Sequence, residues 1–391
     1  MKTITCPSKE VPVIAETQVL VVGSGPAGIS AAVASARCGA KTMLVERYGC
    51  FGGALFVGQV ESYTWYFNKN TYTARGISKE IEDRMIKIGG VQDDDRGCGH
   101  FLNPEKYKYM LDCWIQEEGI TPLLHTLVVD VIMEGKTVKG VIVENKSGRG
   151  AILADRIVDA TGDGDVAALA GAAYEKGENN NGKVLPVTMV FGVSGVDTKT
   201  FRDYIESHPE MTNPDTHGLK LPFRRAKADG KWPVERDGGA WKELTPTGEF
   251  TSLNLTLENG IDGTNVWDLT HAEIQGRQQV MWAVDVLRNY AKEMGFANCS
   301  LRSIAGQIGI RETRRIQGGY SICRRDVLGH SEFDDSIGVY TTFIDGEVVS
   351  KDDAHFQLPY RMILPNGIEN LSVAGRCASC DDDAIQTVRM M

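Results

Sequence analysis

Three glycines and one acidic residue early in the sequence have the types and spacing that dinucleotide binding requires. The segment Gly23-Ser-Gly-Pro-Ala-Gly28 has the form GxGxxG, and Glu46 stands at the end of the next apolar run. In this pattern the first glycine permits a tight turn, the second lets a pyrophosphate approach the backbone, and the third lets a helix pack closely on a strand. A carboxylate at Glu46 can accept hydrogen bonds from both ribose hydroxyls, which disfavours a phosphorylated ribose.

The elements around these residues come in the order that such a site needs. An apolar strand is predicted at 19–22, a helix at 29–37 and a second strand at 41–45. The glycine turn therefore joins strand to helix, and the helix N-terminus offers free N–H groups and a positive dipole end to the pyrophosphate. This context predicts a dinucleotide site rather than a purely structural glycine turn.

A second glycine pair indicates which dinucleotide is bound. Gly52 and Gly53 lie in the segment Arg47-Tyr-Gly-Cys-Phe-Gly-Gly53, directly after Glu46. Tandem glycines allow a bulky group to pass the backbone at close range. They fit a flavin, whose pyrophosphate and ribityl chain would run past this loop, whereas a plain NAD domain would continue into another helix. We therefore expect FAD.

Three further strand-like runs with short turns between them predict an antiparallel meander. These runs are 127–133, 138–144 and 151–158. The last run leads into Asp159-Ala-Thr-Gly-Asp-Gly-Asp165, a second glycine-rich turn, but Asp163 and Asp165 would repel a diphosphate there. We therefore expect this turn to close over the first nucleotide and predict no NAD(P)H-binding domain. The other half-reaction must then use dioxygen, a diffusing donor or a protein partner.

These segments together resemble a known family. The sequence is similar to FAD-dependent oxidoreductases of the glutathione-reductase-like, two-dinucleotide-binding-domain type, in particular the bacterial group with a DATGDGD signature. The resemblance covers roughly 17–175 and 268–391. It is carried by GSGPAG, GCFGG, NPEKYKYMLD, VDATGDGDVAALAGA, QIGIRETRRIQG, LPYRMILP and NLSVAGRCASC. It implies an α/β fold: a Rossmann-like FAD-binding domain with a parallel sheet and a β-meander crossover, plus an inserted α+β cap.

The resemblance also implies a domain division and a set of cofactor contacts. The first part of the FAD-binding domain would be 1–175, the substrate-binding cap 176–300, and the return to the FAD-binding domain 301–391. The residues expected to bind FAD are Gly23, Gly25, Pro26, Ala27, Gly28, Glu46, Arg47, Gly52, Gly53, Val129, Ala160, Thr161, Gly162, Gly375, Arg376, Asp383 and Ile385.

The end of the sequence departs from the family pattern. Relatives continue through a helix beneath the flavin, so we expect a truncated C-terminal helix that begins near Asp383 and carries Ile385 toward the flavin. Cys377 and Cys380 precede it, and packing beside the cofactor is their preferred interpretation. A thiol–disulfide relay to the flavin is the less favoured alternative, and a metal site would need two more ligands.

The flavin would carry the redox chemistry, so candidate catalytic residues are those in segments that return to it. Arg311 could clamp a substrate carboxylate or stabilise the negative charge of the reduced flavin. The preferred alternative is structural: Arg311 and Glu312 form an ion pair that links the domains, while Arg314 and Arg315 face solvent.

Two further catalytic candidates lie close to the predicted return strand. His355 and Tyr360 flank a Leu-Pro pair and could lie over the flavin as general acid or base. The aromatic residues Tyr63, Trp65 and Tyr66 could stack on the flavin, although packing in a core is the preferred interpretation.

The middle of the chain matches the family least and is predicted to form the cap that sets substrate preference. Beyond it, an amphipathic helix is expected from Asp268 to Met294. The residues expected on its apolar face are Ile274, Met281, Val284 and Leu287.

Bulk composition limits the partners of this chain. Its 391 residues carry a net charge of −10 and are 42% hydrophobic, typical of a soluble globular protein. The negative charge disfavours nucleic acid and anionic membrane as partners, and no apolar run reaches the ~18 residues of a membrane span. The nine scattered cysteines indicate reduced thiols in a cytoplasmic protein. We expect no metal.

The sequence therefore predicts an FAD-dependent oxidoreductase that transfers a hydride or electrons between a small organic substrate and N5 of the flavin. One alternative is a flavin-containing electron-relay subunit whose protein partner carries an iron–sulfur centre, because the chain has no four-cysteine cluster of its own. Another is a non-catalytic flavin-binding remnant.

Overall fold

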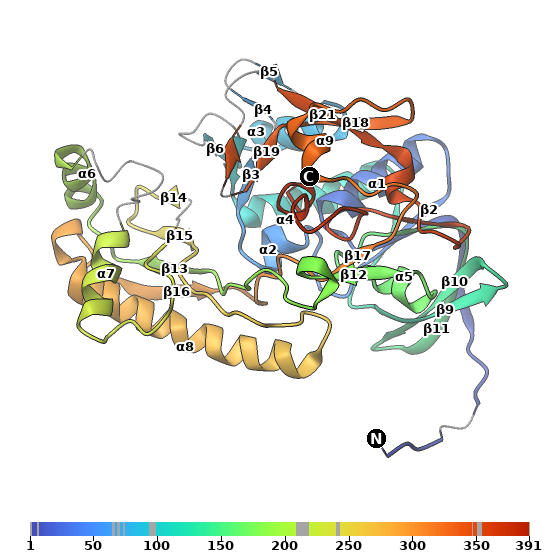
Figure 1. Cartoon of the computed structure of the whole chain (residues 1–391), viewed down its shortest axis with the longest axis horizontal. Helices are drawn as coiled ribbons and strands as arrows, with labels where there is room; N and C mark the ends of the chain where they lie inside the picture. The colour runs from blue at the N-terminus through green and yellow to red at the C-terminus, as the bar shows by residue number, and fades with distance from the viewer. Residues whose placement is uncertain are drawn as a thin grey trace.

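The structure is a computed structural model with two lobes, which Figure 1 shows side by side. One lobe contains a large sheet and the other a smaller sheet and a long helix. The residues described are 2–5, 8–64, 67–68, 71–72, 75–93, 99–208, 219–239, 243–345, 347–349 and 354–390.

A seven-stranded sheet forms the larger lobe. Its strands are β1 (Val13–Val22), β2 (Thr42–Val45), β8 (Thr121–Leu123), β9 (Leu127–Glu134), β10 (Thr137–Asn145), β11 (Gly148–Asp159) and β22 (Leu371–Val373). Their order is β8-β2-β1-β11-β10-β9, and β22 also pairs with β11. Strands β8, β2, β1, β11 and β22 run parallel to their neighbours, whereas β9, β10 and β11 form an antiparallel meander. The predicted α/β fold class is confirmed.

Helices α1 (Pro26–Arg37) and α4 (Pro104–Glu117) pack on one face of this sheet. The α1 residues Ile29 and Val33 share a buried cluster with Leu111 and Trp114 of α4. Asn103 caps α4 by accepting a hydrogen bond from Lys106 N at 3.0 Å, which satisfies one of the free N–H groups of the first turn.

Shorter elements surround this core. Near the first half of the sheet they are α2 (Ala54–Val57), β3 (Ser62–Thr64), β4 (Phe67–Asn68), β5 (Thr71–Tyr72), α3 (Ile77–Lys87), β6 (Val91–Asp93), β7 (Gly99–Leu102) and α5 (Asp165–Leu169). In the last part of the chain they are α9 (Arg324–Leu328), β18 (Ser336–Thr341), β19 (Phe343–Ile344), β20 (Val348–Val349), β21 (His355–Pro359), η4 (Tyr360–Ile363) and α10 (Ile385–Val388).

The second lobe has its own buried apolar cluster, whose members run from Val187 to Ile308. Its antiparallel sheet has the order β14-β15-β13-β16. The elements of this lobe are β13 (Phe191–Ser194), α6 (Thr198–Ser207), α7 (Lys220–Ala228), β14 (Glu243–Leu244), β15 (Phe250–Leu253), α8 (Val266–Tyr290), η3 (Lys292–Met294) and β16 (Ser300–Ile304). The chain passes between the lobes at β12 (Tyr174–Lys176), the short η1 (Glu178–Asn180) and β17 (Arg314–Ile316), and β12 pairs with β17.

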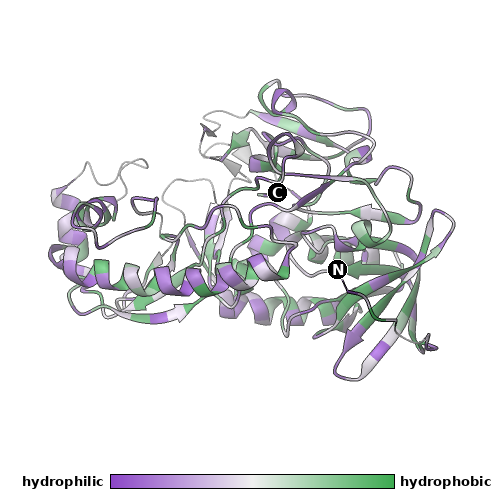
Figure 2. Ribbon diagram, turned by 60° about the horizontal axis from the view of Figure 1, so that its bottom comes forward, coloured by the Kyte–Doolittle hydropathy of each residue, from purple (hydrophilic) through white to green (hydrophobic). Residues whose placement is uncertain are grey.

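Helix α8 is present, but its predicted apolar face is wrong in part. Val284 and Leu287 are buried, whereas Ile274 and Met281 are about half exposed, at 55% and 50%. Hydrophilic and hydrophobic residues alternate along the helix in Figure 2. The buried side is the one that carries Gly276, where a Cβ atom would lie 2.8 Å from Met189 Cβ, so that close contact with the segment before β13 selects this face.

Among the described residues, no helix has both the length and the apolar character needed to cross a membrane.

A buried ion pair ties the two chain crossings to the C-terminal segment. Arg315 pairs with Glu312 and also donates hydrogen bonds of 3.1 Å to Gly177 O and Cys380 O. Glu312 accepts from Gly177 N at 3.1 Å and Leu185 N at 3.0 Å. The predicted pair between Arg311 and Glu312 is therefore wrong: the partner of Glu312 is Arg315, three residues further on, which the β17 strand turns inward.

The prediction that Arg314 and Arg315 face solvent is also wrong. Arg315 is 2% exposed, and Arg314 is largely buried because it pairs with Asp165 at 2.8 Å.

Replacing Arg315 tests the contribution of this pair to stability. Arg315→Met should lower the free energy of unfolding by about 3–5 kcal/mol, because it leaves the Glu312 carboxylate buried without a cation. Urea unfolding followed by circular dichroism measures the change. Arg149→Met, which removes an exposed ion pair with Glu144, should cost less than about 1 kcal/mol. Equal unfolding midpoints for the two variants would contradict this account.

Candidate functional site

The glycine turn after β1 is held by backbone contacts that leave no room for side chains. A Cβ atom on Gly28 would lie 1.9 Å from Gly23 O, and one on Gly23 would lie 2.4 Å from Ala160 O. Gly23 also has φ +95°, a conformation that favours glycine. The start of α1, the end of β1 and the end of β11 therefore meet at this turn.

Gly25 differs from these two glycines, because its missing side chain faces open space. A Cβ atom there would meet no heavy atom within 4 Å, and its φ of −61° is an ordinary one. Gly25 is the N-cap residue of α1, and no side chain caps that helix. The start of α1 thus has free N–H groups beside open space, which fits the pyrophosphate of a dinucleotide.

The second glycine pair packs against this turn. Gly52 N donates to Ser24 O at 2.9 Å. A Cβ atom on Gly53 would lie 2.7 Å from Gly25 Cα. The loop therefore runs directly along the turn, and a side chain on Gly53 would push the two segments apart.

Glu46 ends β2 beside the same turn and is 5% exposed. Its carboxylate accepts hydrogen bonds from Ser24 N at 2.9 Å, Ser24 Oγ at 2.5 Å and Tyr48 N at 3.0 Å. A carboxylate has about four acceptor positions, so capacity for a ribose hydroxyl remains. The next residue, Arg47, contacts Gln307 Oε1 at 3.4 Å, which links this loop to the second lobe.

The end of β11 is organised by a buried carboxylate. Asp159 is fully buried and accepts hydrogen bonds from Thr161 N at 3.1 Å, Thr161 Oγ1 at 2.7 Å and Ala167 N at 2.9 Å. Burial raises the pKa of this carboxyl to about 6, and the hydrogen bonds oppose the rise. Asp159 thereby shapes the turn that contains Ala160, Thr161 and Gly162.

The turn after β22 completes the arrangement. Gly375 has φ +81°, and a Cβ atom on it would lie 3.1 Å from Ala27 Cβ in α1. Arg376 pairs with Asp163 at 2.6 Å and donates to Ile310 O at 2.9 Å.

These contacts bring together most of the predicted cofactor residues at the carboxyl ends of β1, β2, β11 and β22. The residues in this group are Gly23, Gly25, Pro26, Ala27, Gly28, Glu46, Arg47, Gly52, Gly53, Ala160, Thr161, Gly162, Gly375 and Arg376.

The other predicted site residues hold the following positions. Val129 is a half-buried residue of the edge strand β9. Asp383 is exposed, and Ile385 is buried at the start of α10 within the core of the larger lobe. His355 and Tyr360 are both exposed at the two ends of β21. Their roles remain predictions.

Arg311 lies in the loop before β17, where the chain passes between the lobes. Its Nη1 donates to Pro186 O at 2.5 Å. Burial lowers the pKa of Arg311 to about 10, and the charges of Arg389 and Arg236 lower it further, against an opposing effect of Asp345.

The two C-terminal cysteines are free and almost completely buried. Burial raises the pKa values of Cys377 and Cys380 well above that of an ordinary thiol. Both are therefore held as neutral thiols, which supports packing as their role, because a thiol–disulfide relay requires a thiolate.

The aromatic candidates are only partly described. Burial raises the pKa of Tyr63 to about 12. Trp65 and Tyr66 lie outside the described residues.

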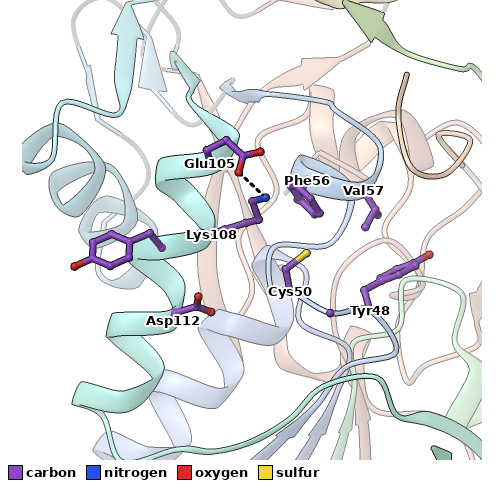
Figure 3. Close-up of a pocket in the computed structure, with 9 residues that line it drawn as sticks. Tyr48, Cys50, Phe56, Val57, Glu105, Lys108 and Asp112 are labelled. Atoms are coloured by element: carbon purple, nitrogen blue, oxygen red, sulfur yellow. Dashed lines mark ion pairs between the residues drawn. The ribbon is translucent and has the colours of Figure 1, made fainter. Parts of the chain in front are cut away.

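A surface cavity of about 590 Å³ lies between the glycine-rich loop and α4, and sequence reasoning missed it. Figure 3 shows Tyr48 and Cys50 from the loop and Phe56 from α2 opposite Lys108 and Asp112 from α4. The polar side chains of α4 looked like an ordinary solvent-facing side, so the sequence carried no signal for the cavity. Burial raises the pKa of the Cys50 thiol to about 11, which disfavours a reactive thiolate there.

The sequence matches a family model and two curated proteins. Residues 18–391 match a family model described as "FAD dependent oxidoreductase". The thiamine thiazole synthase of Aeropyrum pernix is 31% identical over 159 residues, which cover 37% of this chain and 54% of that protein. The dihydrolipoyl dehydrogenase of Buchnera aphidicola subsp. Acyrthosiphon pisum is 55% identical over 49 residues, 12% of this chain and 10% of that protein. The chain thus spans about half or less of the curated relatives' lengths.

Solved structures also match the chain, and two of them have TM-scores below 0.5. The L-proline dehydrogenase from P. horikoshii has a TM-score of 0.46 and 10% identity, with 97% of this chain and 91% of that chain covered. The myxobacterial chondrochloren halogenase CndH has a TM-score of 0.47 and 14% identity, with 96% and 71% covered.

The open space at Gly25 leads to a test that separates cofactor binding from folding. Gly25→Val should leave the melting temperature of the cofactor-free protein close to that of the wild type, because a Cβ atom at this position meets no heavy atom within 4 Å. It should weaken FAD binding by at least about tenfold, since the side chain fills the space in front of the helix N-terminus. Flavin absorbance per mole of protein measures the loss. Gly28→Ala should instead destabilise the fold, and full FAD uptake by Gly25→Val would refute this placement.

The buried Asp159 leads to a prediction on pH. Its folded-state pKa of about 6 lies above the ordinary value of 3.8, so the native state binds the proton more tightly than the unfolded state does. Its contribution to the free energy of unfolding should therefore fall by up to about 3 kcal/mol as pH rises from about 4 to about 6, and then level off. Asp159→Asn should flatten this part of the urea-unfolding profile. Asp155→Asn, an exposed site on the same strand, should keep the wild-type slope, and identical slopes in all three proteins would disprove the assignment.

Proposed function

Because this chain belongs to the FAD-dependent oxidoreductase family, we propose that it is an enzyme that passes a hydride or electrons between a small organic substrate and N5 of bound FAD. The observation that carries the proposal is the open space in front of Gly25, at the uncapped start of α1. Four chain segments meet around this space, and each contributes a glycine at the point of contact. A site of this kind suits a dinucleotide, because the pyrophosphate must come close to the protein backbone.

The roles of the residues follow from the positions that they hold. The N–H groups at the start of α1 bind the pyrophosphate, and Glu46 accepts hydrogen bonds from the ribose. Gly53 would keep the second glycine loop close to the turn, and Arg376, held by Asp163, would add a hydrogen-bond donor beside the cofactor. FAD itself supplies the redox chemistry when bound, while the protein orients it and its substrate.

The domain division assigns different tasks to the two lobes. Residues 1–175 and 301–391 form an FAD-binding domain of the glutathione-reductase-like type, and 176–300 form the cap that selects the substrate. The separate apolar core of residues 187–308 supports this division, because a lobe with its own core can vary without disturbing the sheet. A cytoplasmic location agrees with the free cysteines among the described residues.

The substrate binds between the cap and the cofactor in this proposal. Arg311 lies at that junction, bonded to Pro186 in the crossing segment, and is the first candidate for contact with a substrate. His355 and Tyr360 remain candidates for proton transfer, and both are accessible to solvent.

Flavin content and substrate-driven reduction test this proposal together. The purified protein should be yellow, or should take up FAD on reconstitution, and anaerobic addition of its substrate should bleach the flavin bands. A panel of carboxylic acids, sugars and steroids identifies the substrate class. A colourless protein that takes up no FAD would remove both the enzymatic function and the electron-relay alternative. Full flavin content with reduction only by a co-purifying cysteine-rich protein would favour the relay instead.

A further inference from the structure

The surface cavity between the glycine-rich loop and α4 has two walls of different chemistry. Its volume of about 590 Å³ is enough for a small organic molecule. Helix α4 supplies one wall with Glu105, Lys108, Tyr109 and Asp112. These residues are spaced i, i+3, i+4 and i+7, so they lie on one side of the helix. The cavity therefore has a polar wall that extends over two turns of α4.

The facing wall is mostly apolar. It consists of Tyr48, Gly49 and Cys50 from the loop after β2 and of Phe56 and Val57 from α2. Because burial raises the pKa of the Cys50 thiol to about 11, this side chain is neutral and behaves as a small hydrophobic group. A ligand that fills the cavity therefore needs an apolar part for this wall and a polar part for the wall formed by α4.

Two aromatic rings of the cavity already hold cations of the protein itself. The Lys108 ammonium lies 4.0 Å from the centre of the Phe56 ring, and Figure 3 shows the two side chains next to each other. The Arg47 guanidinium lies 4.8 Å from the centre of the Tyr48 ring, although Arg47 does not line the cavity. The face of an aromatic ring attracts positive charge, because its π electrons make it negative. These rings therefore favour a positively charged ligand over an anion.

The charged groups of the α4 wall leave one negative charge without a partner. Lys108 pairs with Glu105 at 2.6 Å, so these two charges balance each other. Asp112 lies one turn further along the helix. No ion pair or hydrogen bond joins its carboxylate to another side chain in the part of the chain that the structure describes. Since Asp112 is exposed, a ligand can reach it.

The cavity adjoins the cofactor cradle, by which we mean the predicted FAD contacts at the carboxyl ends of β1, β2, β11 and β22. Gly52 and Gly53 belong to the loop that borders the cavity, but both pack against the cofactor turn and neither lines the cavity. None of the other residues of the cradle is among the described residues that line it. A ligand in the cavity would therefore contact the loop without filling the open space at Gly25.

We propose that this cavity binds a small organic cation, an ammonium group that carries an apolar or aromatic substituent. The ammonium group pairs with Asp112, and the substituent packs against Phe56 and Val57. An anion would be repelled by Asp112, and a neutral ligand would leave its charge without a partner. The site is additional to the predicted sites for FAD and for the substrate, and it does not rest on the proposed function.

Three benzene derivatives that differ in charge test this preference: benzyltrimethylammonium, benzyl alcohol and benzoate. Each is titrated into the FAD-loaded wild-type protein at the same ionic strength, and isothermal titration calorimetry measures binding. Benzyltrimethylammonium should bind in a saturable way, with a dissociation constant at least about tenfold below those of the other two compounds. Equal affinities for all three compounds, or no saturable binding of the cation, would overturn the proposal.

Two variants should change the dissociation constant of benzyltrimethylammonium in opposite directions. Asp112→Asn removes the unpaired carboxylate and should raise the constant about fivefold or more. Lys108→Met removes a competing ammonium from Phe56 and leaves Glu105 without its cation, so it should lower the constant about two- to fivefold. Glu117→Gln, on the same helix but outside the cavity, should bind the cation as the wild type does. A wild-type constant in Asp112→Asn would contradict the assignment.

Flavin content separates this site from the cofactor cradle and from the proposed function. Asp112→Asn and Lys108→Met should both keep the wild-type flavin absorbance per mole of protein. Release of FAD by saturating benzyltrimethylammonium, or its loss from Asp112→Asn, would place the cavity within the cradle and overturn the proposal of a separate site. A protein that never takes up FAD but binds the cation through Asp112 would overturn the enzymatic function and retain the cation site.

Discussion

The architecture depends on a close approach of backbones that only glycine permits. Gly28 in α1 touches the carbonyl of Gly23 at the end of β1, and Gly23 touches the carbonyl of Ala160 at the end of β11. A methyl group at either glycine would separate the helix from the strand or the two strands from each other. Because α1 is held so close, its free N-terminus and the carboxyl ends of the parallel strands face the same space.

Charged side chains then join segments that the sheet alone does not connect. Asp163 accepts from Arg376 and from Thr313, and Asp165 pairs with Arg314. The two acids that argue against a second pyrophosphate therefore have a structural use: they bind the segment that returns from the cap. The buried pair of Arg315 and Glu312 ties the same return segment to the outgoing one. The cap is thus anchored to the cradle by ion pairs, whereas its own stability comes from a separate apolar core.

Much of the cradle could be predicted because its signals are local. The glycine turn, the acid after β2 and the meander each depend on residues close together in the sequence. The failures concern choices between distant partners. The apolar face of α8 was predicted in part incorrectly, because Ile274 and Met281 are as hydrophobic as Val284 and Leu287 and the sequence did not show which of them would be buried. The contact of Gly276 with Met189 selects the buried side. The partner of Glu312 was missed because the inward turn of Arg315 depends on strand β17 and not on adjacency in sequence.

The sequence by itself determined the fold class, the family and the dinucleotide turn, because strand, glycine and helix signals within a few dozen residues suffice for them. Only the tertiary structure decided which charges meet. Arg314 and Asp165 lie far apart in the chain. Folding brings them together in an ion pair at 2.8 Å, and Arg376 meets Asp163 at 2.6 Å. Local patterns cannot show these pairs, since they arise from the packing of the return segment and of the turn after β22 against the turn after β11.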